Sequence, residues 1–128
     1  MTVPSLVLII LVGLAGSLGA LTRYLLGRYI AERIISQFPL GTLFINVTGA
    51  FLIGLLFTLT ARNFLSVPLQ TILATGFLGG YTTFSTMSWE GVQLARGGST
   101  PLSSLYLGGS VLLGLLAAAL GMVLGWGL

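Results

Sequence analysis

The feature of this sequence that most constrains its fold is the division of the chain by a few charged residues into long apolar stretches. Residues 1–22 carry no charge, and further charge-free stretches cover residues 34–61, 63–89 and 97–128. A helix needs about 20 mainly apolar residues to cross the hydrocarbon core of a bilayer. Each stretch is long enough to cross once, so the sequence predicts an all-α membrane protein with four transmembrane helices.

Local signals give the ends of these helices. Pro39 and Pro68 lie near predicted helix starts. Proline lacks an N–H and is tolerated there, because the first N–H groups of a helix have no partner within it. Ser99 precedes Thr100 and Pro101, which is typical of an N-cap followed by a first turn. The connections are short, so neighbouring helices are expected to be antiparallel within a single four-helix transmembrane domain, residues 1–128. The predicted helices are 5–30, 40–61, 68–95 and 101–126.

The composition excludes several classes of protein. Only 5% of the residues are charged, whereas a soluble domain carries about 25%, so the bilayer is the natural surrounding of this chain. Five Arg and two Glu are too few for a nucleic-acid footprint. The chain has no His and no Cys, which disfavours a zinc site and a catalytic triad. We therefore expect neither an enzyme nor a nucleic-acid partner.

Small residues recur in the last stretch at the spacing of helix contacts. Ser110, Gly114 and Ala118 are four residues apart, and Gly121 and Gly125 form a GxxxG pair. Such residues let helix backbones approach closely in lipid, so we interpret them mainly as packing positions. Four thin helices enclose little interior, and a polar pathway is therefore expected between subunits of an oligomer.

The third stretch contains a segment that is poorly suited to a helix. The pair Gly79–Gly80 is followed closely by the β-branched pair Thr82–Thr83. The sequence predicts a helix break here, at a depth where backbone outside a helix must be satisfied by protein or line a cavity. Carbonyl groups freed at such a break are suitable ligands for Na⁺. The alternative is a glycine kink stabilised by hydroxyl groups that bind the helix backbone.

Two polar side chains stand out in the first two stretches. Asn46 lies alone in an apolar helix, on one face with Thr42, Gly49 and Ala50. Its amide can donate to an anion, or it can form a hydrogen bond between helices. Arg23 lies at the edge of the first apolar run, where it either extends to the interface or raises the local concentration of anions at a pore mouth.

The remaining polar groups at membrane depth favour an anion as ligand. Tyr106 and Ser110 are one turn apart on the fourth helix, and Phe84 lies among hydroxyls in the predicted break. The edge of an aromatic ring is partly positive and can meet a small anion, although Phe at such a position more often serves packing. One carboxylate, Glu90, lies near the end of the third stretch.

These motifs resemble the Fluc family of fluoride channels, also called CrcB, along essentially the whole chain. The resemblance implies an antiparallel homodimer of dual topology, multi-pass in the plasma membrane, with two fluoride pores along its interface. It also implies a structural Na⁺ at the dimer centre. The motifs that carry it are Gly19–Tyr24, Gly41–Asn46, Gly76–Gly80 and Thr82–Thr86.

The resemblance also implies roles for individual residues. Backbone carbonyls of Gly79 and Thr82 would hold the Na⁺. Met87 stands where the family usually has a second Phe, and Gly114 where another hydroxyl is expected. The residues expected along the fluoride pore are Arg23, Thr42, Asn46, Phe84, Ser85, Thr86, Met87, Tyr106 and Ser110.

The strongest alternative is a small proton-coupled multidrug antiporter, which also uses four helices and a dual-topology dimer. That class needs a carboxylate embedded in the membrane to exchange protons for a cation. The first apolar stretch has none, and Glu90 lies near a helix end. A structural subunit of a larger complex is a further alternative, which the costly helix break disfavours.

Overall fold

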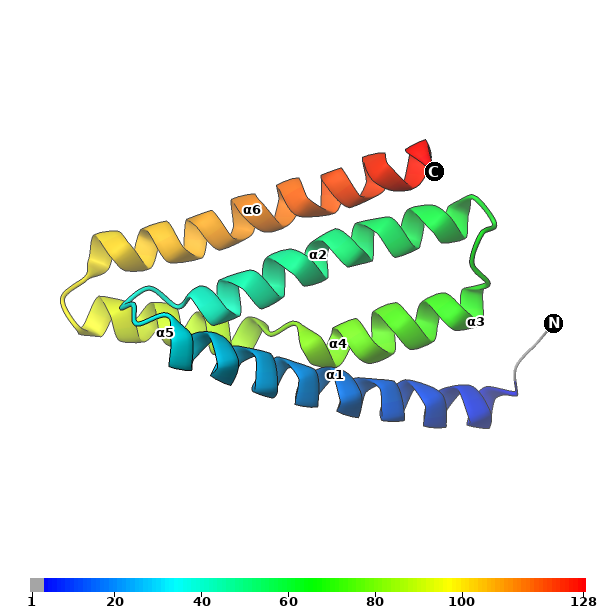
Figure 1. The fold of residues 1–128 in the computed structure, drawn as a ribbon, viewed down its shortest axis with the longest axis horizontal. Coiled ribbons are helices and arrows are strands. Elements are labelled where there is room, and N and C mark those ends of the chain that lie inside the picture. Colours follow the sequence, from blue (N-terminus) through cyan, green and yellow to red (C-terminus); the bar gives the residue numbers. More distant parts are fainter. Residues whose placement is uncertain (1–3) are drawn as a thin grey trace.

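The computed structural model describes residues 4–128, so the first three residues of the predicted domain lie outside the described part. Its helical segments lie side by side along one long direction (Figure 1). The third segment, residues 67–96, is built from shorter pieces. The other three are the single helices α1 (Ser5–Arg33), α2 (Leu40–Ala61) and α6 (Thr100–Gly127). The all-α architecture of four helical segments predicted from the sequence is confirmed.

Successive segments run in opposite directions (Figure 1). The start of α1, the connection between α2 and the third segment, and the end of α6 therefore lie at the same end of the bundle. The helices α1, α2 and α6 are long and apolar enough to cross a bilayer. The third segment does not qualify as one helix because it is interrupted, although its pieces cover the predicted range. The chain is a multi-pass membrane protein.

The third segment changes its helical geometry along its length. Its first turn is capped by Ser66, whose hydroxyl accepts a hydrogen bond from the N–H of Leu69 at 3.3 Å. The next piece has the wider turns of a π-helix, which the sequence did not predict. In chain order the pieces are α3 (Val67–Gln70), η1 (Thr71–Leu78), α4 (Gly79–Tyr81) and α5 (Phe84–Arg96).

The helix break lies between α4 and α5. Thr82 has φ −79° and ψ 157°, and Thr83 has φ −148° and ψ 122°, so both are extended. The predicted break is confirmed, but it falls at the two threonines, and the Gly79–Gly80 pair stays helical. Branching at Cβ suits the threonines to an extended backbone, and the glycines have a different use.

That use is close contact between the third segment and α1. A Cβ added to Gly80 would overlap the carbonyl oxygen of Gly16. In the same way, a Cβ added to Gly19 would overlap the carbonyl oxygen of Phe77. Backbone therefore lies directly against backbone on both sides, the arrangement that small residues permit in membranes. The contact fixes the depth of the break relative to α1.

The helices α2 and α6 pack by the same device. A Cβ on Gly54 would overlap the carbonyl oxygen of Ala118, and one on Gly121 would overlap that of Phe51. The packing role predicted for the small residues of the last stretch is confirmed at these positions. Gly114 differs, since a Cβ there would meet no atom within 4 Å.

Arg62 connects the end of α2 with the end of α6. Arg62, directly after α2, donates from Nη1 to the carbonyl oxygens of Gly125 at 2.7 Å and Trp126 at 3.2 Å. These carbonyls belong to the last turn of α6, where no helical donors follow and a positive charge is favourable. Arg62 therefore supplies both hydrogen bonds and a favourable positive charge to the unpaired carbonyl groups at the end of α6.

The end of the first helix and the capping of the last helix differ from the prediction, while the other helix bounds agree with it to within one residue. The first helix continues to Arg33 instead of ending at residue 30, and a salt bridge between Arg28 and Glu32 at 2.8 Å supports its last turns. Ser99 occupies the N-cap position of α6, but its hydroxyl makes no capping bond. It accepts a hydrogen bond from Nε2 of Gln37 at 3.3 Å instead.

The interior of a single chain is small. Ile45, Leu78 and Tyr81 form its buried apolar cluster, beside the break. The hydroxyl of Tyr81 shares a hydrogen bond of 2.9 Å with that of Thr48 on α2. In α1 the only buried residue is Gly19, so most apolar side chains of this helix face outward, as expected for a helix in lipid.

The contact between α1 and the third segment predicts opposite effects for two glycines of one helix. Gly19→Ala forces a methyl group against the Phe77 carbonyl and is expected to cost about 1–3 kcal/mol, as overpacking does. Gly13→Ala places its methyl where no atom lies within 4 Å and is expected to be neutral or stabilising. Thermal unfolding in detergent measures both, and a Gly19→Ala protein as stable as the wild type would contradict the described contact.

Candidate functional site

The site begins with a two-point contact across the helix break. The Asn46 side chain donates from Nδ2 to the carbonyl oxygen of Thr83 at 2.9 Å. Its Oδ1 accepts a hydrogen bond from the N–H of Thr83, also at 2.9 Å. Of the two roles weighed for Asn46, the structure contains the hydrogen bond between segments. One N–H of the amide stays outside this pair of bonds, because the group carries two.

The hydroxyl groups after the break gather around Thr83. Its Oγ1 accepts from the N–H of Thr86 at 3.2 Å and donates to Oγ1 of Thr86 at 3.1 Å. Oγ of Ser85 lies 3.4 Å from the same atom. Thr83 is thus the N-cap of α5, and the predicted pore residues Ser85 and Thr86 form one polar cluster with it.

These contacts leave two carbonyl groups without their helical donors. In a continuous helix the N–H of Thr83 would bind the carbonyl of Gly79, and that of Thr86 the carbonyl of Thr82. Here Asn46 and the Thr83 hydroxyl take those two N–H groups. Freed carbonyl oxygens at a broken membrane helix are the type of ligand that holds Na⁺. The carbonyl groups of Gly79 and Thr82 therefore have the chemistry that the predicted Na⁺ site requires.

A groove of about 300 Å³ runs past the break on the side of α6. It brings together predicted pore residues from three helices, and Phe84 in it is 77% exposed. Ser110, by contrast, is 6% exposed, and its hydroxyl has no hydrogen-bond partner within residues 4–128. The residues that line the groove include Asn46, Thr82, Thr83, Phe84, Met87 and Ser110.

A second hollow of about 520 Å³ lies on the other side of the break, toward the end of α1. It contains the predicted residues Arg23, Thr42 and Thr86. Thr83, which Asn46 holds by two hydrogen bonds, lines both this hollow and the groove and so lies between them. Arg23 takes part in no salt bridge within the described part of the chain, where Arg28 pairs with Glu32.

Tyr106 does not join the groove that holds Ser110. Its side chain is fully buried at 0% exposure and meets the ring of Phe38 edge to face, with centroids 5.4 Å apart. Its hydroxyl donates to Oε1 of Glu90 at 3.3 Å. Although Tyr106 and Ser110 are one turn apart, the structure places them in different surroundings.

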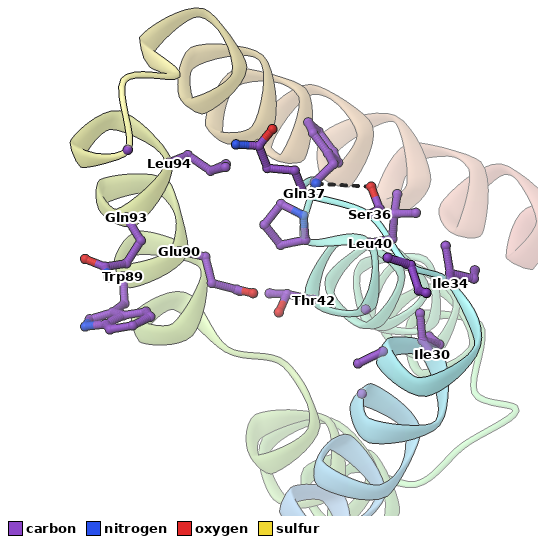
Figure 2. Close-up of a pocket in the computed structure, with 17 residues that line it drawn as sticks. Ile30, Ile34, Ser36, Gln37, Leu40, Thr42, Trp89, Glu90, Gln93 and Leu94 are labelled. Atoms are coloured by element: carbon purple, nitrogen blue, oxygen red, sulfur yellow. Dashed lines mark hydrogen bonds between the residues drawn. The ribbon is translucent and has the colours of Figure 1, made fainter.

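Glu90 is a polar residue beside Tyr106 that was not among the site residues predicted from the sequence. It lines a third hollow, of about 670 Å³, together with Thr42. Figure 2 shows the two side chains directed toward each other from α5 and α2. Helical spacing was the available signal, because Thr83, Thr86 and Glu90 follow each other at three and four residues and so share a face.

Known proteins resemble this chain along most of its length. The model of the family described as CrcB-like protein, Camphor Resistance (CrcB), matches residues 10–122. A fluoride-specific ion channel FluC from Acidobacterium capsulatum is 50% identical over 115 residues, which cover 89% of this chain and 92% of the relative. A fluoride-specific ion channel FluC from Thermus thermophilus is 47% identical over 116 residues, 91% of each chain.

A third relative, fluoride-specific ion channel FluC 1 of Bacillus cereus, is 47% identical over 117 residues, which cover 91% of this chain and 85% of the relative. The family match includes the helix break, the groove and the hollow near Arg23. The resemblance inferred from the sequence motifs is confirmed, and this chain belongs to the CrcB family.

Proposed function

We propose that this chain is a fluoride channel, through which the anion passes down its gradient across the cell membrane. The observation that carries the proposal is the Ser110 hydroxyl, which is buried beside the groove without a partner in the described residues. An unpaired buried hydroxyl costs about 1–3 kcal/mol, so we expect it to donate to a ligand in the groove. The relatives are named as fluoride-specific ion channels, which favours fluoride as the substrate over the cation that a multidrug antiporter exports. The protein is therefore a channel and not an enzyme.

The route we propose connects the hollow near Arg23 with the groove beside α6, and it passes Thr83, which lines both. Arg23 raises the anion concentration at the mouth, since no acidic side chain within residues 4–128 pairs with it. The hydroxyls of Thr42 and Thr86 follow in the same hollow. Beyond Thr83 the anion meets the groove and Ser110. Neutral donors in sequence replace the water around a strongly hydrated ion and still release it.

Two side chains of the groove differ in what they offer an anion. Phe84 can present a partly positive ring edge, and its exposure in a single chain leaves that edge accessible. Met87 has a flexible thioether without such an edge. In this proposal Phe84 supplies the specific contact, while Met87 shapes the groove beside it.

We further propose that a second copy of the chain covers the groove in an antiparallel homodimer. Support comes from the open side of the groove and from Phe84, a large apolar side chain that is 77% exposed next to polar groups. The break lies near the middle of its segment, so an axis in the membrane plane brings the breaks of two inverted copies to one depth. Each copy would contribute one pore.

The same dimer would hold Na⁺ at its centre. The carbonyl oxygens of Gly79 and Thr82 lack their helical donors, and two copies would present four such oxygens. Carbonyl oxygens suit a hard monovalent cation. When bound, the cation would offset the partial negative charge of the carbonyls and join the two breaks.

Liposomes containing the purified protein test fluoride conduction. With an ionophore to balance charge, a fluoride electrode is expected to record rapid efflux, and a chloride electrode none, because the donors suit a small anion. Protein-free liposomes are the control. Absence of fluoride efflux from a folded protein in Na⁺ buffer would overturn the proposal.

Substitution of Ser110 tests the donor that carries the argument. Ser110→Ala removes a hydrogen bond to a charged ligand, worth about 1.5–3 kcal/mol, and is expected to slow fluoride efflux roughly tenfold or more. Ser104→Ala is the matched control, since Ser104 lies exposed on the same helix. Equal rates for both variants in the efflux assay would remove Ser110 from the pathway.

Dual topology is testable because the chain has no Cys. Ala95→Cys places one thiol at the exposed end of α5. If the protein inserts in both orientations, a membrane-impermeant thiol reagent outside intact cells labels part of the protein, and the rest reacts after lysis. Complete labelling, or none, before lysis would contradict dual topology.

A further inference from the structure

We propose that Asn46 and Thr83 are positioning residues for the cation site, because their side chains hold away the two N–H groups that would otherwise bind its carbonyl ligands. This inference deepens the proposed function and rests on its Na⁺ site. It assigns Asn46 a role beyond the anion donor considered from the sequence.

The carbonyl of Gly79 is freed because Asn46 binds the N–H that would pair with it in a helix. Its natural helical donor is the N–H of Thr83, four residues later, and that N–H is bound to Oδ1 of Asn46 at 2.9 Å. The second bond of the amide, from Nδ2 to the Thr83 carbonyl at 2.9 Å, fixes the orientation of the same peptide unit. Thr83 is buried at 8% exposure, so water does not readily replace the amide.

The carbonyl of Thr82 is freed in a similar way. Its natural donor is the N–H of Thr86, which Oγ1 of Thr83 binds at 3.2 Å. Both interactions involve Thr83, one through its N–H and the other through its Oγ1, so each supports the other. Loss of either group would let an N–H compete for a carbonyl, because a buried backbone group without a partner costs about 1–3 kcal/mol.

The residues that free these carbonyls also lie along the proposed pore. Asn46, Thr82 and Thr83 also line the groove, so the bonds that free the carbonyls also shape the surface along which the anion is proposed to move. A change of affinity at the cation site is therefore expected to accompany a change in the groove.

The test is a Na⁺ titration of thermal stability in detergent, with N-methylglucamine, a cation too large for the site, keeping ionic strength constant. A ligand of the native state raises the melting temperature with its concentration. Asn46→Ala and Thr83→Val are expected to raise the Na⁺ concentration for half-maximal stabilisation by roughly 10- to 100-fold, as loss of groups that orient metal ligands does.

Two further variants separate positioning from general destabilisation. Thr48→Val removes the bond to Tyr81 beside the break but touches neither captured N–H, so it should lower the melting temperature and leave the Na⁺ midpoint unchanged. Thr83→Ser keeps a capping hydroxyl and should restore the midpoint lost in Thr83→Val.

The outcomes are distinct. Wild-type midpoints in both Asn46→Ala and Thr83→Val overturn the inference and leave the proposed cation site standing. If one variant does not fold, the other decides. A wild-type protein without any Na⁺-dependent shift overturns the cation site and this inference together, whereas fluoride efflux is measured separately.

Discussion

The pair of hydrogen bonds between Asn46 and the Thr83 peptide is the interaction on which the site depends. It satisfies a buried backbone N–H and a buried carbonyl where no helix can do so. Without it, an interrupted helix at membrane depth would carry unpaired polar groups. The interruption gives the chain its groove, its hydroxyl cluster and its free carbonyl oxygens. One amide thus makes a polar site possible in a predominantly apolar bundle.

Close backbone contacts complete this arrangement by fixing where the break lies. Gly19 and Gly80 bring α1 and the third segment together, while Gly54 and Gly121 do the same for α2 and α6. Because hydrophobic burial drives little association between helices in lipid, close packing must supply it. These four glycines therefore hold the site in register, although none of them lines the groove or the hollow near Arg23.

The sequence predicted the features that depend on local chemistry. Charge-free stretches predicted the helical segments. The Gly79–Gly80 and Thr82–Thr83 pairs together predicted the break, although only the threonines are extended. It could not decide between the two roles of Asn46, because that choice depends on which peptide lies opposite on another segment. The burial of Tyr106 away from Ser110, and the approach of Glu90 to Tyr106, likewise arise from packing between α5 and α6. The π-helical turns of η1 have no signal that we recognise in the sequence.

The central claim is that fluoride itself carries charge through this protein down its own gradient. The most direct measurement is the reversal potential of the membrane current in a planar bilayer containing the protein, under a fluoride gradient at equal pH and equal chloride. The account predicts reversal at the fluoride equilibrium potential, with no shift when a proton gradient is added. Reversal at zero, the chloride equilibrium potential under these conditions, or a reversal potential that follows the added proton gradient would contradict it.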